Sequence, residues 1–124
     1  MTVTADLAMV NLDSPDPVAH AAFWQRVLGG EITHSEPEYA MVTTTAGGGV
    51  ALGFGLVEGY RPPSWPDETA GKRYHLDLYV DDLALAEKEF VAAGASKPGF
   101  QPGGERWVVL IDPAGQPFCV CRRG

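Results

Sequence analysis

The sequence repeats one pattern of secondary structure twice, and this repeat constrains the fold more than any other feature. Asp16 precedes an amphipathic segment that ends at Gly29, and Asp82 precedes a similar segment that ends at Gly94. An aspartate at the N-cap and a glycine just after the last turn are common boundaries of a helix. When the two aspartates are superimposed, the two helix ends agree to within one residue. The sequence therefore predicts two equivalent helices in two related halves.

Each predicted helix is surrounded by segments that have the composition and alternation of β-strands. The expected strands are residues 7–13, 31–34, 39–45 and 50–57 in the first half, and 74–80, 95–98, 106–112 and 117–121 in the second. The order strand, helix, strand, strand, strand thus occurs twice. We expect an α+β fold in which one domain, residues 1–124, contains two βαβββ modules, about 5–57 and about 73–122. A proline-rich connecting loop, residues 58–72, joins them.

The charge and composition of the chain argue against several classes of function. The formal net charge is -7 and the sequence pI is about 4.7, which disfavours binding to nucleic acid or to an anionic membrane. No apolar run reaches the roughly 20 residues that span a bilayer, and the N-terminus does not resemble a signal peptide. We therefore expect a cytoplasmic protein in which Cys119 and Cys121 are reduced thiols.

The predicted strand at residues 74–80 carries an unusual set of polar side chains. His75, Asp77 and Tyr79 alternate with apolar residues, so the polar set shares one face of the strand. A histidine beside a carboxylate can act as a general base that Asp77 orients, as proton abstraction next to a carbonyl requires. A structural hydrogen-bonded pair is the alternative, and we favour it, because such pairs also occur without catalysis.

The two modules, together with the motifs VEGYRPPSWPD, YHLDLYVDD and DPAGQPFCV, resemble the vicinal oxygen chelate superfamily. Within it, the chain is similar to the glyoxalase-like domains and the bleomycin resistance proteins. The resemblance implies that curled mixed sheets surround a cavity and that the helices cover their outer faces. Many members are dimers, so it also implies a homodimer.

The resemblance further implies positions for metal ligands, on the first and last strand of each module. His75 lies at such a position, but Met9 and Cys119 occupy two of the others, and residues 50–57 contain no donor side chain. A thioether is a poor ligand for hard divalent metals, so we expect the usual metal to be absent. Zinc held by His75 and Cys119, with Cys121 or Asp77, is the less favoured alternative.

Without a metal, the cavity implied by the resemblance has the composition of a small-molecule site. The favoured function is the binding of a small organic molecule, of the sequestering kind found in bleomycin resistance proteins. The alternative is a lyase, an isomerase or another superfamily enzyme that uses His75 as a base or an atypical zinc site. A third reading is a regulatory module whose own connecting loop fills the cavity. The expected ligand-binding residues are Met9, Asn11, Phe54, Trp65, His75, Tyr79, Trp107 and Cys119.

Overall fold

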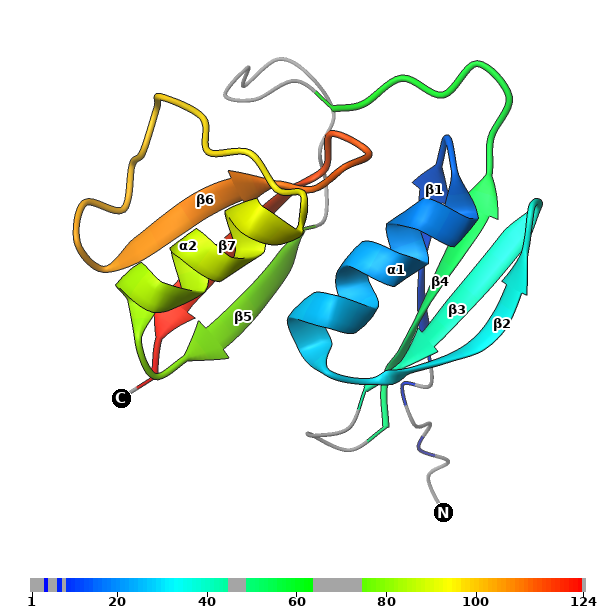
Figure 1. Ribbon diagram of the computed structural model, residues 1–124, viewed down its shortest axis with the longest axis horizontal. Coiled ribbons are helices and arrows are strands. Elements are labelled where there is room, and N and C mark those ends of the chain that lie inside the picture. The colour runs from blue at the N-terminus through cyan, green and yellow to red at the C-terminus, as the bar shows by residue number, and fades with distance from the viewer. Residues whose placement is uncertain (1–3, 5–6, 8, 45–48, 64–74, 124) are drawn as a thin grey trace. The chain divides into compact units, whose positions relative to one another are not determined.

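The computed structural model describes residues 4, 7, 9–44, 49–63 and 75–123 (Figure 1). Contacts within the chain divide it into two units, Met1–Tyr60 and Arg61–Gly124. The boundary between them falls in the predicted connecting loop. Each unit contains one sheet and one helix (Figure 1).

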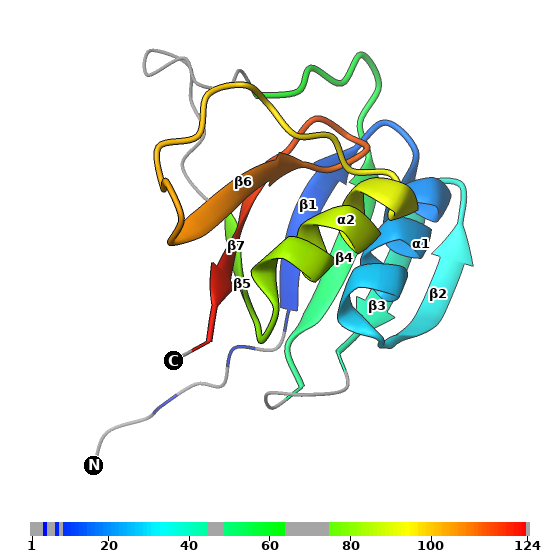
Figure 2. The ribbon, with the colours of Figure 1, turned by 60° about the vertical axis from the view of Figure 1, so that its left-hand side comes forward.

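Unit 1 consists of the elements β1 (Met9–Ser14), α1 (Pro17–Leu28), β2 (Glu31–Glu36), β3 (Tyr39–Thr43) and β4 (Ala51–Leu56). Its strands form a four-stranded mixed sheet in the order β1-β4-β3-β2 (Figure 2). Strand β1 pairs in parallel with β4, whereas the β4–β3 and β3–β2 pairs are antiparallel. Helix α1 packs against β2, β3 and β4.

Helix α1 has the boundaries that the sequence predicts. The side chain of Asp16 accepts a hydrogen bond from the backbone N–H of Ala19 at 3.2 Å, which satisfies one of the free N–H groups of the first turn. Pro17 occupies the first turn, where a missing N–H is tolerated. Gly29 ends the helix with φ 72°, a left-handed conformation that glycine adopts without steric cost.

In its described residues, unit 2 repeats the plan of unit 1 with one strand fewer. Its sheet has the order β5-β7-β6, in which β5 runs parallel to β7 and β6 runs antiparallel to it. Asp82 caps the helix through the backbone N–H of Leu85 at 3.0 Å. The elements are β5 (Leu76–Val80), α2 (Leu83–Ala93), β6 (Trp107–Ile111) and β7 (Pro117–Arg122). The prediction of two related α+β modules is confirmed.

The strand predicted at residues 95–98 is not formed, and a side chain replaces it. Only Ser96 forms a ladder pair, with Ile111, because Pro98 follows closely and has no N–H to donate. After this bridge, the side-chain carboxamide of Gln101 forms hydrogen bonds with the backbone at the edge of β6. Its oxygen accepts from the N–H of Val109 at 2.8 Å and its nitrogen donates to the carbonyl of Val109 at 2.9 Å.

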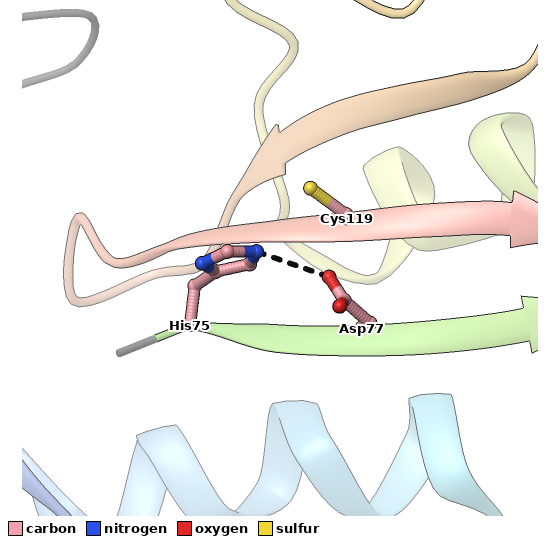
Figure 3. Close-up of side chains that lie close together, drawn as sticks. All are labelled: His75, Asp77 and Cys119. Carbon is pink, nitrogen blue, oxygen red and sulfur yellow. Dashed lines mark ion pairs between the residues drawn. The ribbon is translucent and has the colours of Figure 1, made fainter. Parts of the chain in front are cut away.

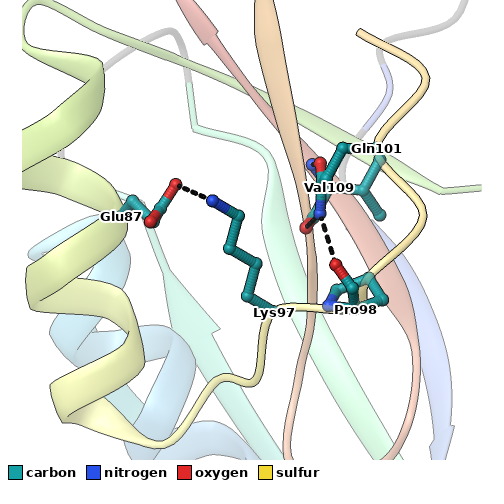
Figure 4. A network of polar contacts seen from close by, with 5 residues as sticks. All are labelled: Glu87, Lys97, Pro98, Gln101 and Val109. Atoms are coloured by element: carbon teal, nitrogen blue, oxygen red, sulfur yellow. Dashed lines mark hydrogen bonds and ion pairs between the residues drawn. The ribbon is translucent and has the colours of Figure 1, made fainter. Parts of the chain in front are cut away.

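A salt bridge and one further hydrogen bond hold the same segment. Lys97 pairs with Glu87 of α2 at 3.0 Å, and the Gln101 nitrogen also donates to the carbonyl of Pro98 at 3.0 Å (Figure 4). Backbone groups of Val109 and Ile111 at the edge of β6 thus have hydrogen-bond partners without a regular fourth strand.

Among the described residues, no helix is long and apolar enough to cross a membrane.

The core of unit 1 includes Phe54, which the sequence analysis placed among the ligand-binding residues. Phe54 has no exposed surface, and its ring centroid lies 4.5 Å from that of His20 on α1. His20 is also buried, with its Nδ1 2.9 Å from the Ser14 hydroxyl. The ring of Phe54 therefore lies between β4 and α1, because the alternation of β4 turns it away from the sheet face that carries Gly53.

Candidate functional site

The polar side chains of unit 2 gather on one face of its sheet. The parallel pairing of β5 with β7 sets Asp77 beside Cys119, and Tyr79 beside Cys121. His75 lies two residues before Asp77 and therefore shares its side of the strand. We call this surface the unit 2 face; it comprises His75, Asp77, Tyr79, Trp107, Cys119 and Cys121.

His75 and Asp77 are in direct contact. The Nε2 atom of His75 lies 3.1 Å from Oδ1 of Asp77 (Figure 3), and the two side chains are 47% and 60% exposed. An ion pair this exposed contributes little to stability, because water screens it. The contact does orient the imidazole of His75, and both side chains stay accessible to a ligand.

The Cys119 thiol completes a cluster of three metal-ligating groups with this pair. Donor atoms of His75, Asp77 and Cys119 all lie within 4.8 Å of one another. Figure 3 shows the three side chains on the same side of the sheet, the first two from the β5 segment and the third from β7. Among the described residues, no other three metal-ligating side chains converge in this way.

Cys121 lies on the same face but outside this cluster. Burial raises the pKa of the Cys121 thiol, and the negative charge of Asp77 raises it further. Both effects disfavour the thiolate, which is the form that binds metals and attacks electrophiles. Cys121 is therefore less suited to either role than an exposed cysteine would be.

The corresponding face of unit 1 is closed by a tyrosine that the sequence analysis did not single out. The Tyr39 hydroxyl lies 3.2 Å from Sδ of Met9 and 3.0 Å from Oδ1 of Asn11. Gly53 lies beside Asn11 in the ladder and beneath these groups; a Cβ atom there would overlap both the Asn11 oxygen and the Tyr39 hydroxyl. We call Met9, Asn11, Tyr39 and Gly53 the unit 1 face. In the sequence, the indication for this contact was that Tyr39 lies on the predicted strand 39–45, which directly precedes the glycine-containing predicted strand 50–57.

The unit 1 face does not fit the divalent metal that the superfamily resemblance implies. Met9 stands at the ligand position, and its sulfur and the Asn11 oxygen both lie within hydrogen-bond distance of the Tyr39 hydroxyl. A thioether paired with a phenol is a poor donor set for a hard cation. In unit 2, Cys119 occupies another of the ligand positions that the resemblance implies, and there it offers a sulfur donor in place of an oxygen or nitrogen donor.

The remaining predicted ligand-binding residues are placed as follows. Tyr79 is 66% exposed on β5. Trp107 is partly exposed on β6, beside Cys121, and its indole ring lies against Gly103. Trp65 lies outside the described residues. The unit 2 face thus brings four of the predicted ligand-binding residues together with Asp77, namely His75, Tyr79, Trp107 and Cys119.

Comparisons with known proteins agree with this architecture. The family model of the glyoxalase-like domain matches residues 9–121. No match was found among the curated proteins. One similar solved structure is a glyoxalase/bleomycin resistance protein/dioxygenase family enzyme from Burkholderia phytofirmans PsJN. It is 26% identical, with a TM-score of 0.68, and the match covers 95% of this chain and 98% of that one.

Two other solved structures share the fold. A glyoxalase-related enzyme from Fulvimarina pelagi is 21% identical, with a TM-score of 0.65 and coverage of 97% and 89%. A bleomycin-binding protein from Streptomyces verticillus, in complex with copper(II)-bleomycin, is 20% identical, with a TM-score of 0.60 and coverage of 99% and 100%. The two related units, with the order βαβββ in unit 1 and βαββ in unit 2, define a protein of the glyoxalase and bleomycin resistance type. The chain belongs to the glyoxalase-like domain family of the vicinal oxygen chelate superfamily.

Proposed function

We propose that this protein binds a small organic molecule through direct contacts with its side chains and without the divalent metal usual in its superfamily. The observation that carries the proposal is the unit 2 face, where the exposed His75, Asp77 and Tyr79 lie side by side on one strand. An aromatic surface with a few fixed polar groups is the typical composition of a small-molecule site. The similarity to a protein solved with bound copper(II)-bleomycin supports the same reading.

The chemistry of both faces suits a planar or cationic compound. Tyr79 and Trp107 offer aromatic surface for stacking, and the exposed carboxylate of Asp77 attracts a positive group. On unit 1, the Asn11 side chain and the Tyr39 hydroxyl are held in one geometry by their mutual contact. The net charge of -7 adds a general attraction for cations. Sequestration of such a compound is the function we propose.

An enzymatic role is the second candidate, and the contact between His75 and Asp77 favours it. The contact of His75 Nε2 with the Asp77 carboxylate holds the imidazole in one orientation, which a general base needs. In this role His75 would remove a proton next to a carbonyl of the bound compound, as in a lyase or isomerase. The same ligand site would then serve catalysis rather than sequestration.

One experiment tests ligand binding and separates the two candidates. Aromatic and cationic compounds are screened for a rise in melting temperature in buffer with EDTA. A compound present at 100 times its Kd stabilises the folded state by about 2.7 kcal/mol, which corresponds to several degrees. NMR of the recovered compound then tells sequestration, in which it is unchanged, from conversion, which His75→Ala should abolish.

Variants of the unit 2 face locate the binding. Asp77→Asn and Trp107→Ala are expected to reduce the ligand-induced rise in melting temperature, whereas Val91→Ala, on the exposed surface of α2, should leave it unchanged. The proposal is wrong if no compound stabilises the protein, or if both face variants keep the full effect.

The homodimer and the cytoplasmic location remain predictions. We propose a dimer in solution on the basis of the superfamily resemblance, and light scattering at micromolar concentration measures it directly. A mass near twice 13.2 kDa is the expected result, and a monomeric mass would contradict it.

A further inference from the structure

We infer that unit 2 contains a binding site for a thiophilic divalent cation, of which zinc is the common representative, formed by His75, Asp77 and Cys119. This site differs from the superfamily's usual centre in two respects. All three donors come from a single unit, and one of them is a thiol. The inference goes beyond the proposed binding of an organic molecule and does not depend on it.

The backbone brings these three donors together. Asp77 and Cys119 are direct partners in the parallel β5–β7 ladder, and paired residues of neighbouring strands project to the same side of a sheet. His75 joins them from two residues earlier on the same side. Strand pairing therefore fixes the Cα positions of Asp77 and Cys119, and His75 lies directly before the first paired residue of β5. A cation would then be bound mainly by side-chain rotation.

The distances are close to what a tetrahedral zinc ion requires. Zinc binds nitrogen and oxygen at about 2.0–2.1 Å and sulfur at about 2.3 Å, so neighbouring donors in a tetrahedron lie about 3.3–3.6 Å apart. In the structure His75 and Asp77 are separated by 3.1 Å, and no pair of donors exceeds 4.8 Å. Adjustments of about 1 Å are within the reach of rotamer changes in the exposed side chains of His75 and Asp77.

The donor set determines which cations the site prefers. Imidazole and thiolate are preferred ligands of zinc, whereas magnesium, calcium and manganese prefer oxygen donors. With Asp77 and Cys119 both deprotonated, the two negative charges balance those of the ion. Three protein ligands leave a fourth position for water or a small molecule, as in catalytic rather than structural zinc sites.

The test is a metal titration of the full chain, prepared without a polyhistidine tag and kept reduced with a phosphine. Cadmium serves as a probe, because its bond to a thiolate gives an ultraviolet charge-transfer band, and zinc competes with it. We expect saturation at one equivalent and displacement of cadmium by zinc but not by magnesium. Loss of a direct ligand should weaken binding at least about tenfold, since even outer partners of a ligand are worth 10–100-fold. Cys119→Ser should abolish the band.

The chain supplies two matched controls. Cys121→Ser removes a thiol from the same face two residues away, and it should keep the band and the affinity within about twofold. His34→Ala disrupts a second histidine–carboxylate pair of the described residues, that of His34 with Glu36 at 3.6 Å, which is not part of a three-ligand cluster there. It should also leave binding unchanged.

Several outcomes would overturn the inference. These are the absence of saturable binding, a band that survives Cys119→Ser, and equal losses in Cys119→Ser and Cys121→Ser. If Cys119→Ser proves unfolded by circular dichroism, the exposed His75→Ala and Asp77→Asn decide, and unchanged affinity in both contradicts the site. Because the ligand screen is done in EDTA, a failure of either proposal is recognised independently of the other.

Discussion

Replacing Phe54 with alanine is expected to lower the free energy of unfolding by about 3–5 kcal/mol. The side chain has no exposed surface and stacks on His20 at a centroid distance of 4.5 Å. Its removal would leave a cavity between β4 and α1 that close-packed neighbours fill only in part. Because small domains have a total stability of about 5–15 kcal/mol, urea unfolding should be measured at low temperature, where the variant stays folded.

Phe100→Ala is the matched control for this prediction. The side chain of Phe100 is 55% exposed, so the same chemical change removes less buried surface and should cost less than about 1 kcal/mol. Similar losses for the two variants would contradict the placement of Phe54 in the core. A small loss for Phe54→Ala, combined with the disappearance of ligand-induced stabilisation, would instead restore the role that the sequence suggested for it.

The helices were predictable because their boundaries are local. Asp16 and Asp82 each accept a hydrogen bond from the first turn, and Gly29 and Gly94 end the helices, interactions that span only a few residues. The repeat of this pattern then predicted the equivalence of the two units. The α+β class followed from it, as did the order βαβββ of unit 1; unit 2 forms the same order without its third predicted strand.

The absence of a strand at residues 95–98 could not be predicted from local sequence in the same way. Its failure depends on Gln101, whose carboxamide bonds both backbone groups of Val109. A side chain that replaces a strand leaves no periodic signal, and Pro98 was the only local indication. The core position of Phe54 was not predicted for a related reason. Alternation separates the two faces of a strand, but the position of the helix decides which face becomes the core.

The candidate site was predictable only in part. The proximity of His75 and Asp77 follows from their spacing on one strand. The position of Cys119 beside Asp77 depends on the register between β5 and β7, which distant parts of unit 2 determine. The involvement of Tyr39 likewise depends on the pairing of β3 with β4, which brings Met41 opposite Gly53 and leaves room for the tyrosine ring.

Gly30→Ala is expected to destabilise the protein by about 3 kcal/mol, the upper end of the usual range for overpacked sites. A Cβ atom at Gly30 would overlap the backbone carbonyl oxygen of Thr43. That carbonyl cannot move independently, because Thr43 is paired with Glu31 in the β2–β3 ladder and with Ala51 in the β3–β4 ladder. The strain would therefore be distributed through the sheet of unit 1 and should appear as a lower midpoint in urea unfolding.

Gly55→Ala provides the control, since it makes the same substitution in the same sheet. No atom lies within 4 Å of a Cβ at Gly55, and its φ is not positive, so the methyl group has space and the backbone is not strained. Its effect should stay within about 1 kcal/mol, because alanine also reduces the conformational freedom of the unfolded chain. Equal losses at the two positions would mean that β2 does not approach β3 as closely as the structure places it. A loss confined to Gly30→Ala would show that the chain entering β2 passes directly against the Thr43 carbonyl, with no room for a side chain at this glycine.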